Sequence, residues 1–125
     1  MQKILFIEDE SALQRTLGKK LELAGYTIIE AMDGEKGIEL AKSEKPDLIL
    51  LDLILPKKNG FDVLKEIRSF EKTKNIPVII LTNLDGTKEV EKALEFGATT
   101  YLVKINYSLE DVIEKIGKIL SKNEN

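Results

Sequence analysis

The sequence predicts an α/β fold, in which a parallel sheet of five strands is covered by five helices on its two faces. Short apolar runs alternate five times with longer segments of helical periodicity, which is the pattern of repeated strand–helix units. Two of the runs, 47–51 and 77–82, are apolar almost throughout, as strands buried on both faces are. At 125 residues, the chain has the size of one domain.

The strands and the first two helices have recognisable boundaries. Ser11 and Gln14 have the spacing of a capping box, so their side chains are expected to bond free N–H groups at the start of the first helix. That helix would end at Gly25, and the second would extend from Asp33 to Pro46. The expected strands are 3–7, 26–31, 47–51, 77–82 and 100–103.

The other three helices follow from their apolar periodicity. The third follows Gly60, the fourth ends near Gly97, and the last starts at a second capping box, formed by Ser108 and Asp111. Their apolar residues are Phe61, Leu64 and Ile67 in the third, Val90, Ala93 and Leu94 in the fourth, and Leu109, Val112, Ile113, Ile116, Ile119 and Leu120 in the fifth.

The connections predict where a ligand binds. Crossovers between parallel strands are right-handed, so helices can cover both faces only if the strand order reverses within the sheet. The common solution for five strands is the flavodoxin-like, doubly wound order 2-1-3-4-5, with a ligand site beyond the carboxyl ends of strands 1 and 3. We therefore expect the residues that follow strands 1, 3, 4 and 5 to converge.

Those strand ends carry carboxylates, a hydroxyl and an ammonium group. Oxygen ligands select a hard cation, and a few carboxylates at an open, water-filled site suit Mg²⁺ or Mn²⁺ better than a caged Ca²⁺. One acid, Glu10, is expected to be only a solvated residue that interacts with the helix dipole. The residues at the strand ends are Glu8, Asp9 and Glu10 after strand 1, Asp52 after strand 3, Thr82 at the end of strand 4 and Lys104 after strand 5.

A carboxylate in this setting can accept a phosphoryl group. Asp52 would be the attacking group, while the cation and Lys104 would neutralise the phosphoryl oxygens and the Thr82 hydroxyl would donate a hydrogen bond to one of them. No general base is needed, because a carboxylate is already ionised at pH 7.

Composition excludes several other chemistries. The chain has no Cys and no His, so disulfides, thiolate sites, His-ligated zinc, Ser-His-Asp triads and a phosphohistidine of its own are excluded. No apolar run approaches the length of a membrane span, and the N-terminus lacks the layout of a signal peptide. With a net charge of −3, we expect a cytoplasmic domain that contacts neither membrane nor nucleic acid directly.

Four segments resemble the receiver domain of two-component response regulators, the CheY-like family, over essentially the whole chain. The acidic corner 6–10 and the segment 47–60 match, as do Pro77–Thr82 and Tyr101–Lys104. The resemblance implies a receiver domain over 1–121, followed by a polar tail over 122–125. It also implies a phosphoprotein in a signal transduction phosphorelay that catalyses only its own phosphorylation and dephosphorylation.

The resemblance assigns a role to each matching residue. Asp52 would be the phosphoacceptor, taking the phosphoryl group from a histidine of a partner kinase or phosphotransfer protein. Asp9 would bind Mg²⁺ directly, Glu8 would help through water, and Ile54 would offer only its backbone carbonyl.

Three more residues would read out the phosphorylation. Thr82 and Lys104 would contact the acyl phosphate, and Tyr101 would turn inward when Thr82 moves. A downstream protein target would then sense the changed surface, with the domain acting as a monomer or a weak homodimer.

The chain also departs from the family pattern. Ile105 follows Lys104 where the family often has a cis-proline, and a cis bond before a non-proline residue costs about 3–4 kcal/mol, which favours a trans bond here. Asn83 stands where a small residue is usual and could narrow access to the phosphoryl group. Because Ile54 and Leu84 offer nothing to orient a water molecule, we expect slow hydrolysis of the phosphoryl group.

The sequence also bears on three other functions: a phosphatase, an FMN-binding protein and a pseudo-receiver. A haloacid dehalogenase-type phosphatase needs a second Asp two residues after its nucleophile, where this chain has Ile54. An FMN site is disfavoured by the three acids after strand 1, which would repel the phosphate. The main alternative is a phosphate-independent interaction module with the same fold, a pseudo-receiver.

Overall fold

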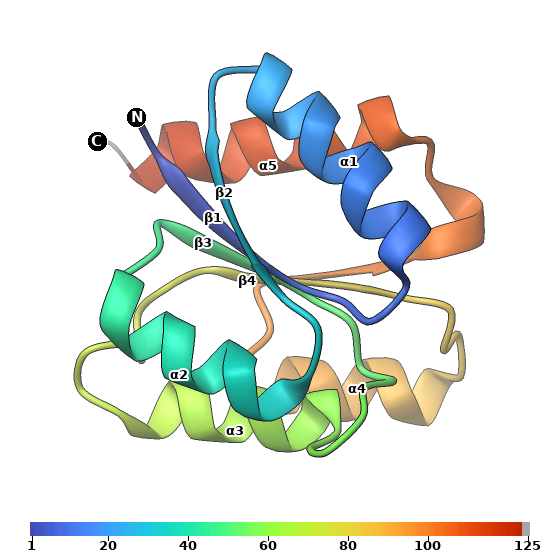
Figure 1. Cartoon of the computed structure of the whole chain (residues 1–125). Coiled ribbons are helices and arrows are strands. Elements are labelled where there is room, and N and C mark those ends of the chain that lie inside the picture. Colours follow the sequence, from blue (N-terminus) through green and yellow to red (C-terminus); the bar gives the residue numbers. More distant parts are fainter. Residues whose placement is uncertain (124–125) are drawn as a thin grey trace.

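Five parallel strands form one sheet at the centre of the computed structural model, which describes residues 1–123 (Figure 1). In chain order, the elements are β1 (Lys3–Ile7), α1 (Ser11–Leu23), β2 (Thr27–Ala31), α2 (Gly34–Glu44), β3 (Leu48–Leu51), α3 (Gly60–Ser69), β4 (Val78–Thr82), α4 (Thr87–Glu95), β5 (Thr100–Val103), the 3₁₀ turn η1 (Lys104–Asn106) and α5 (Leu109–Asn123). The strand order is β2-β1-β3-β4-β5. Helices α1 and α5 cover one face, and α2, α3 and α4 cover the other. The predicted flavodoxin-like α/β fold is confirmed.

The pairing register brings the carboxyl ends of the strands to one edge of the sheet. Ile7, the last residue of β1, lies opposite Ala31 on β2 and Leu51 on β3, which are also the last residues of their strands. Thr82 at the end of β4 lies opposite Val103 at the end of β5. The residues that follow these strands therefore emerge at the same edge, as the topology predicted.

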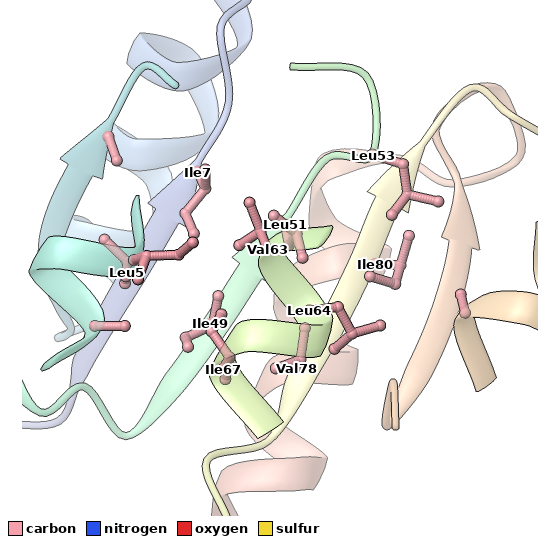
Figure 2. Packing of buried hydrophobic residues seen from close by; sticks show 14 residues of the cluster. Leu5, Ile7, Ile49, Leu51, Leu53, Val63, Leu64, Ile67, Val78 and Ile80 are labelled. Atoms are coloured by element: carbon pink, nitrogen blue, oxygen red, sulfur yellow. The ribbon is translucent and has the colours of Figure 1, made fainter. Parts of the chain in front are cut away.

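Alternating strand residues build two apolar cores, one on each face of the sheet. From β1, Leu5 and Ile7 face the core beneath α2, α3 and α4, whereas Ile4 and Phe6 belong to the core beneath α1 and α5. Figure 2 shows the first of these cores, in which strand residues pack against α3. Its labelled members are Leu5, Ile7, Ile49, Leu51, Leu53, Val63, Leu64, Ile67, Val78 and Ile80.

The predicted helix starts are correct for α2 and α5. The Asp33 carboxylate accepts a hydrogen bond from the Lys36 backbone N–H at 2.8 Å. At the start of α5, the capping box is reciprocal: Ser108 N–H donates to Asp111 Oδ2, and Asp111 N–H donates to Ser108 Oγ, both at 3.1 Å.

The capping box expected at Ser11 and Gln14 is wrong. The N-cap of α1 is Glu10, which makes no side-chain capping bond, and Ser11 is the first helical residue. Gln14 is buried, because it lies on the inward stripe of the helix with Leu17 and Leu21. Its amide therefore reaches back to the strand ends instead of the helix start.

Strands β1 and β5 have the expected bounds. Strands β2, β3 and β4 each begin one residue later than expected. Helix α5 continues to Asn123 and so includes the first half of the expected polar tail, and the rest of that tail, 124–125, lies outside the described residues. Over residues 1–123, no helix has the length and apolar character that crossing a membrane requires.

Candidate functional site

Three carboxylates meet where β1 and β3 end. One carboxylate oxygen from each of Glu8, Asp9 and Asp52 lies within 4.8 Å of the other two. The backbone explains this approach, because Asp52 N–H donates to Ile7 O at 3.0 Å and so continues the pairing of the two strands. Glu8 and Asp52 are buried and Asp9 is exposed, so the cluster has one open side.

The Lys104 ammonium faces these carboxylates. Lys104 follows β5, and its Nζ lies 3.0 Å from Asp52 Oδ2, 2.9 Å from Glu8 Oε1 and 3.4 Å from Glu10 Oε1. Burial alone would lower the pKa of Lys104, but its contacts with Glu8 and Asp52 outweigh burial and raise that pKa. The ammonium group therefore stays charged and compensates part of the negative charge.

Glu8 is the least satisfied of the acids. Its Oε2 accepts from Glu10 N–H at 3.1 Å, whereas Oε1 accepts no hydrogen bond and has only the ion-pair contact with Lys104. Burial raises the pKa of Glu8 to about 7; the contact with Lys104 opposes this rise, and the charge of Asp52 adds to it. A buried carboxylate oxygen that has only the Lys104 ion pair, beside two further carboxylates, fits a hard cation such as Mg²⁺.

The loop after β3 orients Asp52. Ile54 N–H donates to Asp52 Oδ1 at 3.2 Å, while the Ile54 side chain is 55% exposed. A Cβ at Gly60 would lie 2.4 Å from both Asp52 O and Leu53 Cα, so only glycine permits this loop to close so tightly. The backbone of the loop thus fixes the carboxylate, and the Ile54 side chain is left at the mouth of the site.

Thr82, at the end of β4, and Tyr101, on β5, both contact Leu84 in the loop that follows β4. Thr82 is fully buried, and its Oγ1 is 3.5 Å from Leu84 N, a contact at the limit of a hydrogen bond. The Tyr101 hydroxyl donates to Leu84 O at 2.6 Å. Burial raises the pKa of Tyr101 to about 12, with smaller contributions from Glu89, Asp52 and Asp85. The tyrosine therefore remains a neutral donor that holds the loop after β4.

The two unusual residues near the site are both exposed. Asn83 follows Thr82, and Ile105, which follows Lys104, is 80% exposed. No peptide bond over residues 1–123 is cis, and the bond between Lys104 and Ile105 is trans.

Two residues have contacts that the sequence did not predict. Glu10 is more than a solvated acid, since its carboxylate lies 3.4 Å from Lys104 Nζ. Gln14 donates from Nε2 to the backbone of the acidic corner and to the end of β2. A signal for Gln14 was present, because a polar residue three and seven positions before Leu17 and Leu21 stands on an otherwise apolar helix face.

Comparisons with known proteins agree on one family. The sequence pattern of the family described as response regulator receiver domain matches residues 4–117. The DNA-binding dual master transcriptional regulator RpaA of Synechocystis sp. is 38% identical over 124 residues, which cover 99% of this chain and 51% of that protein. The chain thus spans about half the length of the curated relatives it matches.

Solved structures agree over nearly the whole chain. A CheY-like response regulator receiver domain protein from Methanospirillum hungatei JF-1 superposes with a TM-score of 0.92 and 25% identity, covering 99% of this chain and 97% of that one. The receiver domain of the sensor histidine kinase PA1611 from Pseudomonas aeruginosa PAO1 gives a TM-score of 0.82 and 29% identity, covering 97% and 95%. That structure has a magnesium ion coordinated in its active-site cleft.

Proposed function

This chain belongs to the response regulator receiver domain family of two-component signal transduction, and from that premise we propose that it accepts a phosphoryl group on Asp52. A partner histidine kinase or phosphotransfer protein would supply the group, and the phosphorylated domain would pass a conformational change to a protein partner. The observation that carries this proposal is the buried Asp52 carboxylate, which shares a cluster with Asp9 and Glu8 and lies 3.0 Å from the Lys104 ammonium.

The transfer requires a donor from outside the chain, which contains no His. An Asp52 carboxylate oxygen would form a bond to phosphorus while the bond from phosphorus to the donor imidazole nitrogen breaks, and that nitrogen keeps the electron pair. Lys104, already in contact with Asp52 Oδ2, is placed to neutralise a phosphoryl oxygen. The buried Thr82 hydroxyl would donate a hydrogen bond to another.

The acidic cluster would hold the cofactor. Asp9 and Asp52 would bind Mg²⁺ directly, Glu8 would help through water, and the Ile54 backbone carbonyl would be a further ligand. Bound Mg²⁺ would withdraw charge from the phosphoryl oxygens and lower the repulsion between them and Asp52. The sensor kinase receiver domain that contains magnesium in its cleft supports this assignment.

The signal would leave the site through the loop after β4. Thr82 contacts Leu84, and Leu84 accepts the Tyr101 hydroxyl bond, so a movement of Thr82 toward the phosphoryl group would disturb the hold of Tyr101 on this loop. Such a change acts by shifting the populations of two states of the surface around β4, β5 and their helices. The surface is proposed to bind protein, since the net charge of −3 disfavours nucleic acid.

We do not propose that the domain hydrolyses the phosphoesters of other molecules. Ile54 stands where a phosphatase would need its second acid, so the domain would catalyse only its own phosphorylation and dephosphorylation. The same apolar residue and Leu84 offer nothing to orient a water molecule, which supports slow loss of the phosphoryl group.

Intact mass after incubation with acetyl phosphate tests the proposal. We expect one added phosphoryl group in the presence of Mg²⁺, little or none with EDTA, and none in the Asp52→Asn variant. Absence of both the adduct and Mg²⁺ binding would contradict the proposal and favour the phosphate-independent pseudo-receiver. Mg²⁺ binding without an adduct would also contradict phosphorylation of the native site, and Asn83→Ala would then test whether Asn83 blocks it.

A further inference from the structure

Gln14 is a buried polar side chain whose contacts all lie at the acidic corner. It is 2% exposed. Its Nε2 lies 3.0 Å from Ala31 O, 3.1 Å from Glu8 O and 3.3 Å from Phe6 O. An amide nitrogen has two N–H groups, so three carbonyl oxygens share them. One side chain therefore joins α1 to the ends of both β1 and β2.

These contacts fix the backbone that carries two of the proposed Mg²⁺ ligands. Glu8 N–H donates to Ala31 O at 3.0 Å, and Glu8 O accepts from Gln14, so the peptide groups on both sides of Glu8 are held. Glu10, the N-cap of α1, makes no side-chain capping bond, and Glu8 Oε2 accepts from Glu10 N–H at 3.1 Å within the corner itself. The Gln14 amide is the side-chain contact that ties the Glu8 carbonyl to α1.

We propose that Gln14 is a positioning residue for the metal site: its amide holds the β1–α1 corner in the conformation in which the Glu8, Asp9 and Asp52 oxygens converge. The inference rests on the proposed function, since it assumes that this cluster binds Mg²⁺. Some residues do not bind the metal but orient its ligands through hydrogen bonds. Their loss commonly weakens metal binding by about 10–100-fold. Gln14 would act in this way, through the backbone of Glu8 and Asp9.

A purely structural role is the competing explanation, because a buried amide that donates to backbone carbonyl groups stabilises a fold wherever it occurs. Thr73 provides a matched control for this role. It is 1% exposed and lies between α3 and β4, before the amino end of β4, and its Oγ1 donates to Ile67 O at 2.6 Å. Replacement of either residue by an apolar one removes a buried donor, but only Gln14 touches the acidic corner.

The experiment compares Mg²⁺ affinity by isothermal titration calorimetry for the wild type, Gln14→Leu and Thr73→Val. Each protein is first shown by circular dichroism to be folded at the temperature used. We expect both variants to melt at lower temperature. The Mg²⁺ dissociation constant should rise about 10-fold or more in Gln14→Leu and stay at the wild-type value in Thr73→Val. If Gln14→Leu does not fold, Gln14→Met, which has a similar length and no donor, takes its place.

A second readout separates metal binding from chemistry. At saturating Mg²⁺, the rate of phosphorylation of Gln14→Leu by acetyl phosphate should return toward that of the wild type, because the defect lies in affinity. An unchanged dissociation constant in Gln14→Leu, or an equal rise in Thr73→Val, would overturn the inference while leaving Asp52 as the phosphoacceptor. If the wild type itself neither binds Mg²⁺ nor gains a phosphoryl group, the proposed function fails, and the inference fails with it.

Discussion

The carboxylates at the amino edge and at the carboxyl edge of the sheet differ in burial and in hydrogen bonding. At the amino edge, Asp47 is exposed, and its Oδ2 accepts a hydrogen bond from Lys3 N–H at 2.7 Å. At the carboxyl edge, Glu8 is fully buried, and its Oε1 accepts no hydrogen bond. Asp47 is thus satisfied by a backbone N–H, whereas one ammonium, that of Lys104, faces Glu8 and Asp52 together and leaves negative charge that a ligand could satisfy.

Between the two edges, the interiors of the neighbouring strands β1 and β3 are apolar. Residues 4–7 of β1 and 48–51 of β3 are completely buried, and Glu8 and Asp52 are the next residues along the chain. The buried strands stabilise the fold, so two neighbouring carboxylates can be held close together despite their repulsion. The change from apolar core to charged site occurs within one residue, because the strands end in register.

The largest expected effect comes from breaking the sheet interior. Leu50→Ala should lower the free energy of unfolding by about 2–5 kcal/mol, because it leaves a cavity in a fully buried position. Urea denaturation measures this loss. The Mg²⁺ dissociation constant of the folded variant should match that of the wild type. A large change in affinity would show that the interior and the site are not separable.

A smaller effect, dependent on pH, distinguishes the two edges. The folded-state pKa of Glu8 is about 7, against an ordinary value of 4.5. Between these two values the folded state binds more protons than the unfolded state, so without metal this group removes stability as pH rises through that window. Glu8→Gln should therefore be more stable than the wild type by about 1–3 kcal/mol at pH 8 and nearly equal to it at pH 4.5.

The measurement is urea unfolding in EDTA at both pH values. Asp47→Asn is the matched variant at the amino edge and should lose about 0.5–1.5 kcal/mol at pH 8, because it weakens a hydrogen bond that is already formed. If Glu8→Gln were as destabilising as Asp47→Asn at pH 8, the contrast between the edges would be wrong.

A third prediction concerns the coupling from the site to the surface. Thr82→Ala should leave the extent of phosphorylation close to that of the wild type and should reduce the spectral changes that phosphorylation causes. The reason is that Thr82 is the buried residue between Asp52 and the Leu84–Tyr101 contact. Backbone amide NMR shifts of α4 and β5, recorded with and without acetyl phosphate, test this. Shift changes in the variant as large as those in the wild type would show that Thr82 does not couple the site to α4 and β5.

The smallest expected effect concerns the lifetime of the phosphoryl group. With Ile54 at the mouth of the site, loss of phosphate from the purified domain should take minutes or longer, and Ile54→Gln, which adds an amide able to orient water, should shorten the half-life several-fold. Intact mass over time after removal of the donor gives both rates. A half-life of seconds in the wild type would contradict the account.

Much of this arrangement could be predicted from the sequence because it depends on periodicity and topology. The alternation of strands and helices determined the sheet, and right-handed crossovers brought Glu8, Asp52 and Lys104 to one edge. The capping box of Ser108 and Asp111 is also local, and it formed as predicted.

The wrong capping box and the contacts that the sequence did not predict concern side chains that reach between elements. Gln14 has the spacing of a capping residue, but its place on the apolar stripe turns it inward to carbonyl groups that sequence spacing does not reveal. Glu10 reaches Lys104 across 94 positions, and Tyr101 bonds the Leu84 carbonyl from a neighbouring strand. Such contacts depend on rotamers in the packed structure, which a sequence pattern alone does not specify.

The most direct test of the central claim is to identify the carboxylate that carries the phosphoryl group. Hydroxylamine cleaves an acyl phosphate, releasing phosphate and leaving a hydroxamate on the residue that held it, and peptide mass spectrometry then locates that residue. After treatment with acetyl phosphate and Mg²⁺, we expect a hydroxamate at Asp52 alone, and none when EDTA replaces Mg²⁺. A hydroxamate at another carboxylate, or an adduct that resists hydroxylamine, would contradict this claim.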